Sequence, residues 1–321
     1  MKGSRTSVMK DSRRRSLKYL NNGGLMSILS ERRRTWKRAP VSIQKNLIKE
    51  NFFQKIEKTI HDEKSALCIT YKHGVNLQHL TFLKKATRYL VDAGLPFSYL
   101  ASFDHTRQGF RGIWTFCEGK ISKEWGWQEY SAFGEFLGKM HTLSKDYKPS
   151  TMEKIPLILS LRENYENLKS YLPESFESVE SILTIIEQKW PLFLPTGLIH
   201  TDLFPNNVLF KQNKVSGVLQ NHNMQIDLLV YDLTAVVKSL YFSSTENIEI
   251  KEKAFFDAYT SYYKMSAEEL IALPILTAAK LLHTVLSLAH KHLTEAIYSD
   301  THLNSAAIAL VHAEKALHLY Q

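Results

Sequence analysis

The stretch Gly197-Leu-Ile-His-Thr-Asp-Leu-Phe-Pro-Asn-Asn-Val-Leu-Phe210 decides the fold of this chain. Its two apolar ends predict short strands, and the polar residues between them predict a loop. Inside the loop His200, Asp202 and Asn207 have the spacing H-x-D-x-x-x-x-N. Asp and Asn are also ordinary turn residues, so the triplet alone leaves open a plain hairpin with a polar tip.

Phosphoryl transfer gives a physical reason for this spacing. In a kinase catalytic loop the Asp accepts the proton of the substrate hydroxyl, and the Asn holds a Mg²⁺ ion on the phosphates. By this chemistry Asp202 is the candidate catalytic group and Asn207 a candidate metal ligand. The residues that follow the loop favour this interpretation over the plain hairpin.

Lys214 to Leu219 predicts a further strand, and Tyr231-Asp232-Leu233 predicts the start of a helix. In a small-molecule kinase with a protein-kinase-like fold, that strand ends in an Asp that chelates Mg²⁺. Here the strand ends in Leu219-Gln220-Asn221, so Gln220 stands in the place of the carboxylate. An amide is a neutral and weaker ligand for a hard cation.

Together with Trp190-Pro191, Leu194-Pro195 and Val215-Ser-Gly-Val-Leu219, these segments resemble the type II homoserine kinases. Those enzymes belong to the aminoglycoside phosphotransferase or choline kinase-like superfamily. The run from Asp202 to Asn207 is closer to this family than to generic choline or aminoglycoside kinases. The resemblance extends, more weakly, from about Ser65 to the C-terminus. It implies an α+β, protein-kinase-like bilobal fold with a small β-rich N-lobe and a large, mostly helical C-lobe.

The resemblance also implies roles for residues around the loop. His200 and Asp232 would be structural at the site, Asp232 because a carboxylate at a helix start meets free N–H groups and can brace the loop. Asp227 matches a family Asp that would contact the substrate amine, although a solvated loop residue is as good an interpretation. The backbone of Phe116, Cys117 and Glu118 would connect the lobes and hold adenine, unless this segment is a plain edge strand.

Residues 1–40 contain twelve Lys or Arg and only two acids, a charge of +10, so the rest of the chain carries about −1 of the total of +9. Few apolar residues recur at any period there, and we expect a disordered basic extension. A nucleic-acid arm, a targeting peptide and a nuclear signal are alternatives to a simple solvated tail. We favour the tail, with at most non-specific contact to nucleic acid.

Residues 41–119 should form the N-lobe, with a strand at Ala66–Tyr71 and a helix at Leu77–Ala93. This nucleotide lobe is degenerate, because no glycine occurs between Gly24 and Gly74, where the family has a phosphate-covering hairpin. Lys72, at the end of the strand, is the nearest candidate for a phosphate contact. Residues 120–321 should form the helical C-lobe, with Pro274 interrupting one of its helices.

The composition fits a folded protein of the cytoplasm. Of the 321 residues 44% are hydrophobic and 23% charged, and no uninterrupted apolar run approaches the length of a membrane helix. The two cysteines, Cys68 and Cys117, lie in apolar runs and should be buried and reduced.

Two functions remain open at this stage. One is an ATP- and Mg²⁺-dependent phosphotransferase that acts on a small-molecule hydroxyl, by resemblance a homoserine kinase of threonine biosynthesis. The other is a catalytically impaired pseudokinase that serves as a binding or regulatory module. His200, Asp202, Asn207 and Asp232 favour the first, whereas Gln220 and the absent glycine loop favour the second.

Overall fold

The computed structural model describes most of the chain after residue 45. The described residues are 46–50, 54–71, 75–122, 124–145, 147–149, 156–203, 205–242, 247–294 and 300–318. The expected disordered extension at 1–40 and Lys72 lie outside them, so these predictions are not tested.

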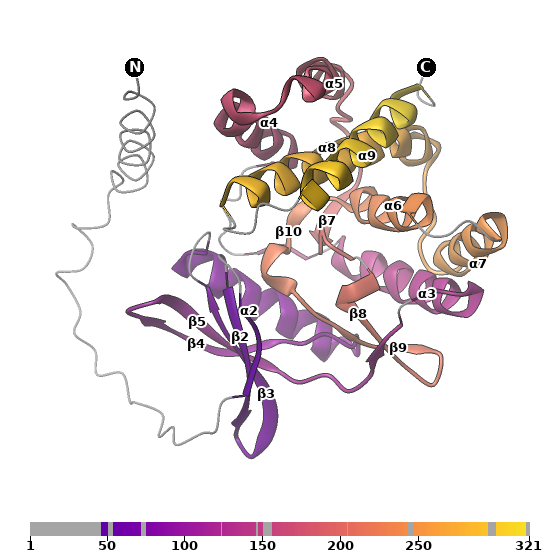
Figure 1. Cartoon of the computed structure of the whole chain (residues 1–321). Coiled ribbons are helices and arrows are strands. Elements are labelled where there is room, and N and C mark those ends of the chain that lie inside the picture. Colours follow the sequence, from indigo (N-terminus) through magenta and orange to yellow (C-terminus); the bar gives the residue numbers. More distant parts are fainter. Residues whose placement is uncertain are drawn as a thin grey trace, which may run out of the picture. The chain divides into compact units, whose positions relative to one another are not determined.

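The N-terminal region is built on a five-stranded antiparallel sheet with the order β1-β2-β3-β5-β4. Its strands are β1 (Asn46–Glu50), β2 (Gln54–His61), β3 (Lys64–Tyr71), β4 (Leu100–Thr106) and β5 (Gly109–Thr115). β3 is the predicted strand and lies in the middle of the sheet, paired with β2 and β5. In Figure 1 these strands and helix α2 lie together in the indigo to purple part of the chain.

Helix α2 (Leu77–Asp92) lies between β3 and β4 in the chain and is the predicted helix. Its start is capped by Asn76, whose Oδ1 accepts a hydrogen bond from the His79 N–H at 2.8 Å. Its end is followed by Gly94, which has a φ of +85° that side chains disfavour. The helix buries the apolar stripe that includes Leu80 and Leu83 against the core.

Helices dominate the rest of the chain. They are α3 (Trp127–Ser144), α4 (Leu157–Leu168), α5 (Ser178–Gln188), α6 (Leu233–Phe242), α7 (Ile248–Thr260), α8 (Ala267–Thr294) and α9 (Asp300–His318). α8 packs against α4, α5, α6 and α9, and these later helices form the upper part of Figure 1. The α+β fold with a small sheet region and a larger helical region is therefore confirmed.

Helix α8 differs from the prediction, because it continues through Pro274 without a break. A proline removes one backbone donor and strains its own turn, but burial of Ile275, Leu276 and Leu282 holds the helix on both sides of it. Among the described residues this is the helix that is long and apolar enough to span a membrane, over Ala267–Leu293. Of its most apolar window 61% is buried inside the protein, as in a core helix.

The catalytic-loop stretch lies between short strands, as predicted, but these do not form a hairpin with each other. β7 (Thr196–Ile199) pairs with β10 (Gln225–Leu228), whereas β8 (Val208–Lys211) pairs with β9 (Lys214–Val218) and with β6 (Lys120–Ile121). The loop therefore bridges two small sheets. Its two ends are each anchored by a different partner strand.

Candidate active site

The loop between β7 and β8 brings Asp202 and Asn207 together. The side-chain Nδ2 of Asn207 donates to the backbone oxygen of Asp202 at 2.7 Å and to its carboxylate Oδ2 at 3.2 Å. The 3₁₀ turn η3 (Pro205–Asn207) makes this return possible within a few residues. Both bonds use the amide nitrogen of Asn207, so its side-chain oxygen takes no part in holding Asp202.

Asp232 braces this loop from the C-terminal region. Its buried carboxylate accepts hydrogen bonds from the backbone N–H of His200 at 2.8 Å and of Thr201 at 2.7 Å. Thr201 has a φ of +69°, a strained conformation for a β-branched residue, and the paired carboxylate bonds compensate for it. His141, from α3, lies 3.6 Å from the same carboxylate and is itself bonded to the Tyr259 hydroxyl at 2.8 Å.

His200 is fully buried and connects the loop to the segment after β9. Its Nδ1 accepts from the Asp202 N–H at 3.2 Å, so Nε2 carries the proton. Nε2 lies 3.0 Å both from the Leu219 carbonyl and from Oδ1 of Asn221. Burial lowers the pKa of His200, which favours the neutral ring, and the hydrogen bonds at its two nitrogens select this tautomer.

Gln220 lies in the segment that His200 holds. It adopts the left-handed conformation, with φ 62° and ψ 36°, before the 3₁₀ turn η4 (Asn221–Asn223). Asn221 anchors the segment by donating to the Ser98 carbonyl at 2.5 Å. His79 of α2 lies within hydrogen-bond distance of the His222 carbonyl, at 2.6 Å.

The donor set in this region does not match a magnesium site. Among the described residues no group of three or more His, Cys, Asp or Glu could hold a metal ion. Asp202 is a carboxylate, but the candidate metal ligands Asn207 and Gln220 are neutral amides, and Mg²⁺ prefers carboxylate oxygen. These residues therefore do not form a complete set of Mg²⁺ ligands.

Lys280 adds a positive charge that the sequence analysis missed. Its ammonium comes from α8, donates to the Thr201 carbonyl and lies 3.8 Å from the Asp202 carboxylate Oδ1. Burial alone would raise the pKa of Asp202, but Lys280, His200 and Lys238 together hold it below its usual range. The carboxylate is thus kept ionised. A lysine inside the apolar run from Ala272 to Leu282 was the signal in the sequence.

Asp227 lies in β10, and its carboxylate accepts three hydrogen bonds from other residues of the protein. Its carboxylate accepts from the Leu157 N–H at 3.1 Å, from Gln225 Nε2 at 3.1 Å and from the Leu228 N–H at 2.8 Å. The first of these bonds satisfies a free donor at the start of α4. The proposed contact with a substrate amine is not tested by this arrangement.

The candidate hinge, residues 116–118, follows β5, which ends at Thr115, so these residues do not continue that strand. Phe116 is half-exposed under the ammonium of Lys58, and Glu118 pairs with Lys211 at 2.7 Å. Burial raises the pKa of the Cys117 thiol to about 11, which leaves it protonated. β9 passes so close that a Cβ on Gly217 would lie 2.5 Å from the Cys117 Cβ.

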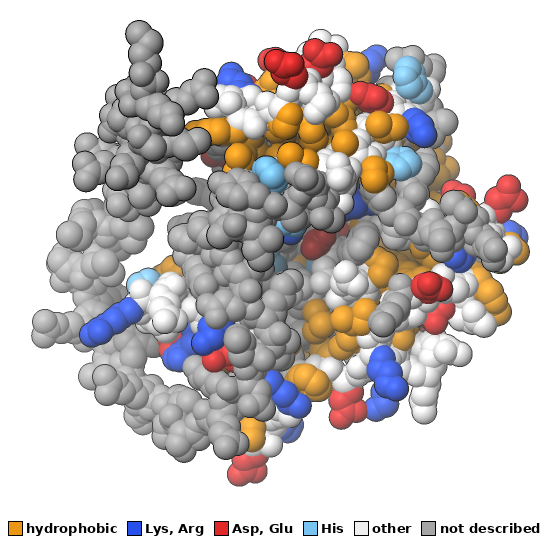
Figure 2. Space-filling view, in the orientation of Figure 1, with side chains coloured by type: hydrophobic (Ala, Val, Ile, Leu, Met, Phe, Trp, Pro, Cys, Tyr) orange, Lys and Arg blue, Asp and Glu red, His pale blue; other side chains and the backbone are white. Residues whose placement is uncertain are grey.

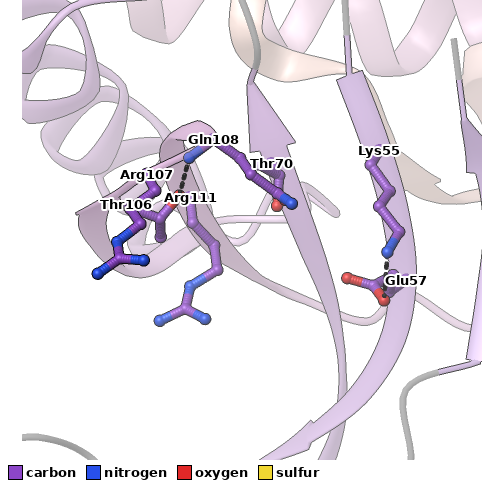
Figure 3. Close-up of a pocket in the computed structure, with 7 residues that line it drawn as sticks. All are labelled: Lys55, Glu57, Thr70, Thr106, Arg107, Gln108 and Arg111. Atoms are coloured by element: carbon purple, nitrogen blue, oxygen red, sulfur yellow. Dashed lines mark hydrogen bonds and ion pairs between the residues drawn. The ribbon is translucent and has the colours of Figure 1, made fainter.

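A separate hollow of about 450 Å³ lies on the N-terminal sheet, and Figure 3 shows its lining. Strands β2, β3 and β5 and the β4–β5 turn supply Lys55, Glu57, Thr70, Thr106, Arg107, Gln108 and Arg111. Lys55 pairs with Glu57 at 3.2 Å, and Arg111 donates to Asp104 at 2.9 Å. None of the predicted site residues lines this hollow.

The chain belongs to the phosphotransferase enzyme family whose model matches residues 66–265. A homoserine kinase of Beijerinckia indica is 30% identical over 171 residues, which are 51% of this chain and 52% of that protein. A homoserine kinase of Rhizobium meliloti is 27% identical over 71% of this chain and 73% of its own length. The chain thus spans about half the length of the first of these relatives.

Solved structures support the same fold. An amicoumacin kinase in complex with AMP-PNP, Ca²⁺ and Ami has a TM-score of 0.70 at 14% identity, over 85% of this chain and 87% of that one. A microcompartment-associated aminopropanol kinase has a TM-score of 0.64 at 12% identity, over 87% of this chain and 91% of that one. These structural similarities show that the chain has a kinase-like fold.

Proposed function

We propose that this chain is an ATP-dependent phosphotransferase that acts on the hydroxyl of a small molecule, and that the acceptor is L-homoserine. The observation that carries the proposal is the pairing of Asp202 with Asn207 in a loop braced by Asp232. The homoserine kinases among its relatives and the nucleotide complex of a fold neighbour support the acceptor and the donor.

In this reaction the acceptor oxygen forms a bond to the γ-phosphorus, and the bond from that phosphorus to the β–γ bridging oxygen breaks. Asp202 accepts a hydrogen bond from the acceptor hydroxyl and takes its proton as the new bond forms. Lys280, 3.8 Å from the carboxylate, keeps it ionised before the reaction. Adenine would lie against the backbone of residues 116–118, and Asp227 would contact the substrate amine.

Mg²⁺ supplies charge neutralisation of the phosphates in this class of reaction. Asn207 and Gln220 would face it here, and they form a weak set of ligands. This weak set of Mg²⁺ ligands is the one observation that favours the second candidate function. That function is a pseudokinase that binds its ligand but does not catalyse phosphoryl transfer. We place the enzyme in the cytoplasm, in threonine biosynthesis, without a membrane partner.

We propose no nucleic-acid partner for the folded part of the chain. On the face seen in Figure 2, Lys and Arg of the described residues are interspersed with Asp and Glu and form no continuous basic patch. Only the basic extension would contact nucleic acid, without sequence preference.

A coupled ADP assay tests the proposal. The purified chain with Mg-ATP should release ADP on addition of L-homoserine and not on addition of L-norvaline, which lacks the hydroxyl. ADP release that is independent of the acceptor, or no release with any hydroxylated acceptor at saturating nucleotide, would favour the binding module.

A further inference from the structure

Helices α3 and α7 pack closely enough to bring two buried polar side chains together behind the candidate site. A Cβ on Gly138 of α3 would lie 2.6 Å from the Tyr259 carbonyl of α7, so the close approach needs a glycine there. His141 lies one turn further along α3. Its Nδ1 lies 2.8 Å from the Tyr259 hydroxyl, and both side chains are fully buried. The helix crossing therefore holds the imidazole against the phenol.

The other nitrogen of His141 faces the carboxylate that braces the catalytic loop. His141 Nε2 lies 3.6 Å from Asp232 Oδ2, slightly beyond hydrogen-bond length, and has no hydrogen-bond partner among the described residues. Because an ionised carboxylate only accepts, Nε2 carries a proton, and in the neutral ring Nδ1 accepts from the Tyr259 hydroxyl. Burial raises the pKa of Tyr259, which keeps the phenol protonated and able to donate.

Asp232 connects this pair of side chains to the catalytic loop. Its Oδ2 also accepts from the His200 N–H at 2.8 Å, and its Oδ1 accepts from the Thr201 N–H at 2.7 Å. Thr201 has a φ of +69°, and the N–H of the next residue, Asp202, donates to His200 Nδ1 at 3.2 Å. The position of the catalytic carboxylate thus depends on how the Asp232 carboxylate is oriented.

A second tyrosine beside His141 provides a comparison. The Tyr263 ring lies 5.9 Å from the His141 ring and the Tyr259 ring 5.7 Å from it, and both meet the imidazole edge to face. The Tyr263 hydroxyl, however, donates to Glu269 at 3.0 Å, near the start of α8. The two tyrosines therefore pack on His141 in the same way and differ in the group that their hydroxyl contacts.

Packing alone does not require polar atoms at His141 and Tyr259. Apolar side chains of similar size would fill the same space, whereas an imidazole and a hydroxyl lose hydration on burial. Their mutual hydrogen bond offsets part of this loss, but it leaves His141 Nε2 facing Asp232. The polar pair is explained if the Nε2 proton orients the Asp232 carboxylate.

We propose that His141 and Tyr259 are positioning residues of the candidate site, which act through Asp232 on the conformation of Asp202. The Tyr259 hydroxyl sets the orientation of the His141 ring, and the ring adds a third donor to the two backbone N–H groups around Asp232. Both side chains are fully buried, so neither contacts the acceptor. The effect on turnover rests on the proposed phosphotransferase function, whereas the effect on the loop does not.

Tyr259→Phe and Tyr263→Phe form a matched pair of variants. Each removes one buried hydroxyl and keeps its ring, so both should lose a similar amount of stability, but only the first removes the bond to His141. With L-homoserine and Mg-ATP, Tyr259→Phe should lower kcat about tenfold and leave both KM values nearly unchanged. Tyr263→Phe should keep nearly the kcat of the wild type. Equal kcat values in the two variants overturn the inference.

Amide hydrogen exchange, followed by NMR, tests the effect on the loop without any reaction. The amides of His200 and Thr201 should exchange about tenfold faster in Tyr259→Phe than in Tyr263→Phe. The amides of β3, in the middle of the N-terminal sheet, are the internal control. Exchange at the two loop amides that is the same in both variants contradicts the inference.

Variants of His141 test the proposed donor itself. His141→Leu should expose the amides of His200 and Thr201 to exchange as Tyr259→Phe does. His141→Gln, whose amide N–H can point toward Asp232, should restore part of their protection. If His141→Leu does not fold, the two Phe variants decide. Protection that is equal in the Leu and Gln variants would show that no donor at this position orients Asp232.

The outcomes also separate this inference from the proposed function. Faster loop exchange in Tyr259→Phe, with no phosphorylation by any form of the protein, refutes the phosphotransferase and keeps the positioning role. Phosphorylation of L-homoserine by the wild type, with the two Phe variants alike in kcat and in exchange, does the reverse. A Tyr259→Phe variant that loses only stability would assign the hydroxyl to packing and overturn the inference.

Discussion

The Asp202 side and the Gln220 side of the candidate site are held in similar ways but offer different chemistry. On the first, Asp232 fixes the backbone and Asn207 fixes the carboxylate. On the second, His200 and Asn221 fix a strained backbone turn, yet the side chain presented at 220 is a neutral amide. The backbone is held in place on both sides of the site, but only the Asp202 side presents a carboxylate.

The comparison shows that the backbone geometry of the site does not depend on the charge of the side chain at position 220. The left-handed turn at Gln220 is stabilised by hydrogen bonds from its neighbours and does not need a carboxylate at that position. Lys280 lies on the Asp202 side, 3.8 Å from the Asp202 carboxylate Oδ1, so the charged groups of the site gather on that side. The following predictions change one side at a time.

Asp232→Ala should have the largest effect on the free energy of unfolding. It leaves the buried N–H groups of His200 and Thr201 without an acceptor, which should cost about 3 kcal/mol. Denaturant unfolding measures this, and Asp232→Asn, which keeps one acceptor oxygen, should cost about half as much. An Ala variant as stable as the wild type would show that the loop is not braced here.

Asn221→Ala is the matched change on the other side and should cost less, about 1–2 kcal/mol. It removes a donor to the Ser98 carbonyl and an acceptor for His200 Nε2, but His200 keeps the Leu219 carbonyl. The same unfolding measurement compares the two variants. A larger loss than that of Asp232→Ala would reverse the ranking of the two sides.

The stability should rise with pH above about 8 because of Lys238. Burial and Lys280, with Lys291 adding and Asp202 opposing, lower its pKa in the folded protein from 10.5 to about 8. Between these values the unfolded chain binds more protons, so deprotonation favours the folded state. With allowance for solvent screening the gain should be about 1–2 kcal/mol between pH 7.5 and 10. Lys238→Met should lack this gain, and an identical pH profile would contradict the assignment.

Deletion of residues 1–40 should have the smallest effect. Because these residues hold the net charge of +10 and few apolar residues, the deletion should leave stability and ligand affinity unchanged. It should abolish salt-sensitive binding to a polyanion such as heparin. A truncated protein that unfolds, or that no longer binds nucleotide, would show that the segment belongs to the folded unit.

The sequence predicted those features that depend on local pattern. The strand at Ala66–Tyr71 and the helix at Leu77–Ala93 follow from apolar periodicity and from Gly94. The loop spacing also placed Asp202 and Asn207 close together. These features need no information from distant parts of the chain.

Features that depend on distant partners were not predicted. The partner strand of β7 is β10, which follows β8 and β9 in the chain, so the loop could be mistaken for a hairpin. Lys280 reaches the loop from a helix 79 residues further on, and Asp227 bonds to Leu157, 70 residues earlier. Pro274 predicts a break in the local sequence, but the packing of distant residues around α8 keeps the helix continuous.

The central claim is that the site has a complete acceptor side and lacks one charge on its metal side. Magnesium-dependent phosphorylation of L-homoserine by Gln220→Asp tests it most directly. The rate should rise at least tenfold over the wild type, about 1.4 kcal/mol of barrier, and Asp202→Ala in the same background should remove the gain. A Gln220→Asp variant that binds Mg-ATP no better and forms no phosphohomoserine would contradict the claim and leave the chain a binding module.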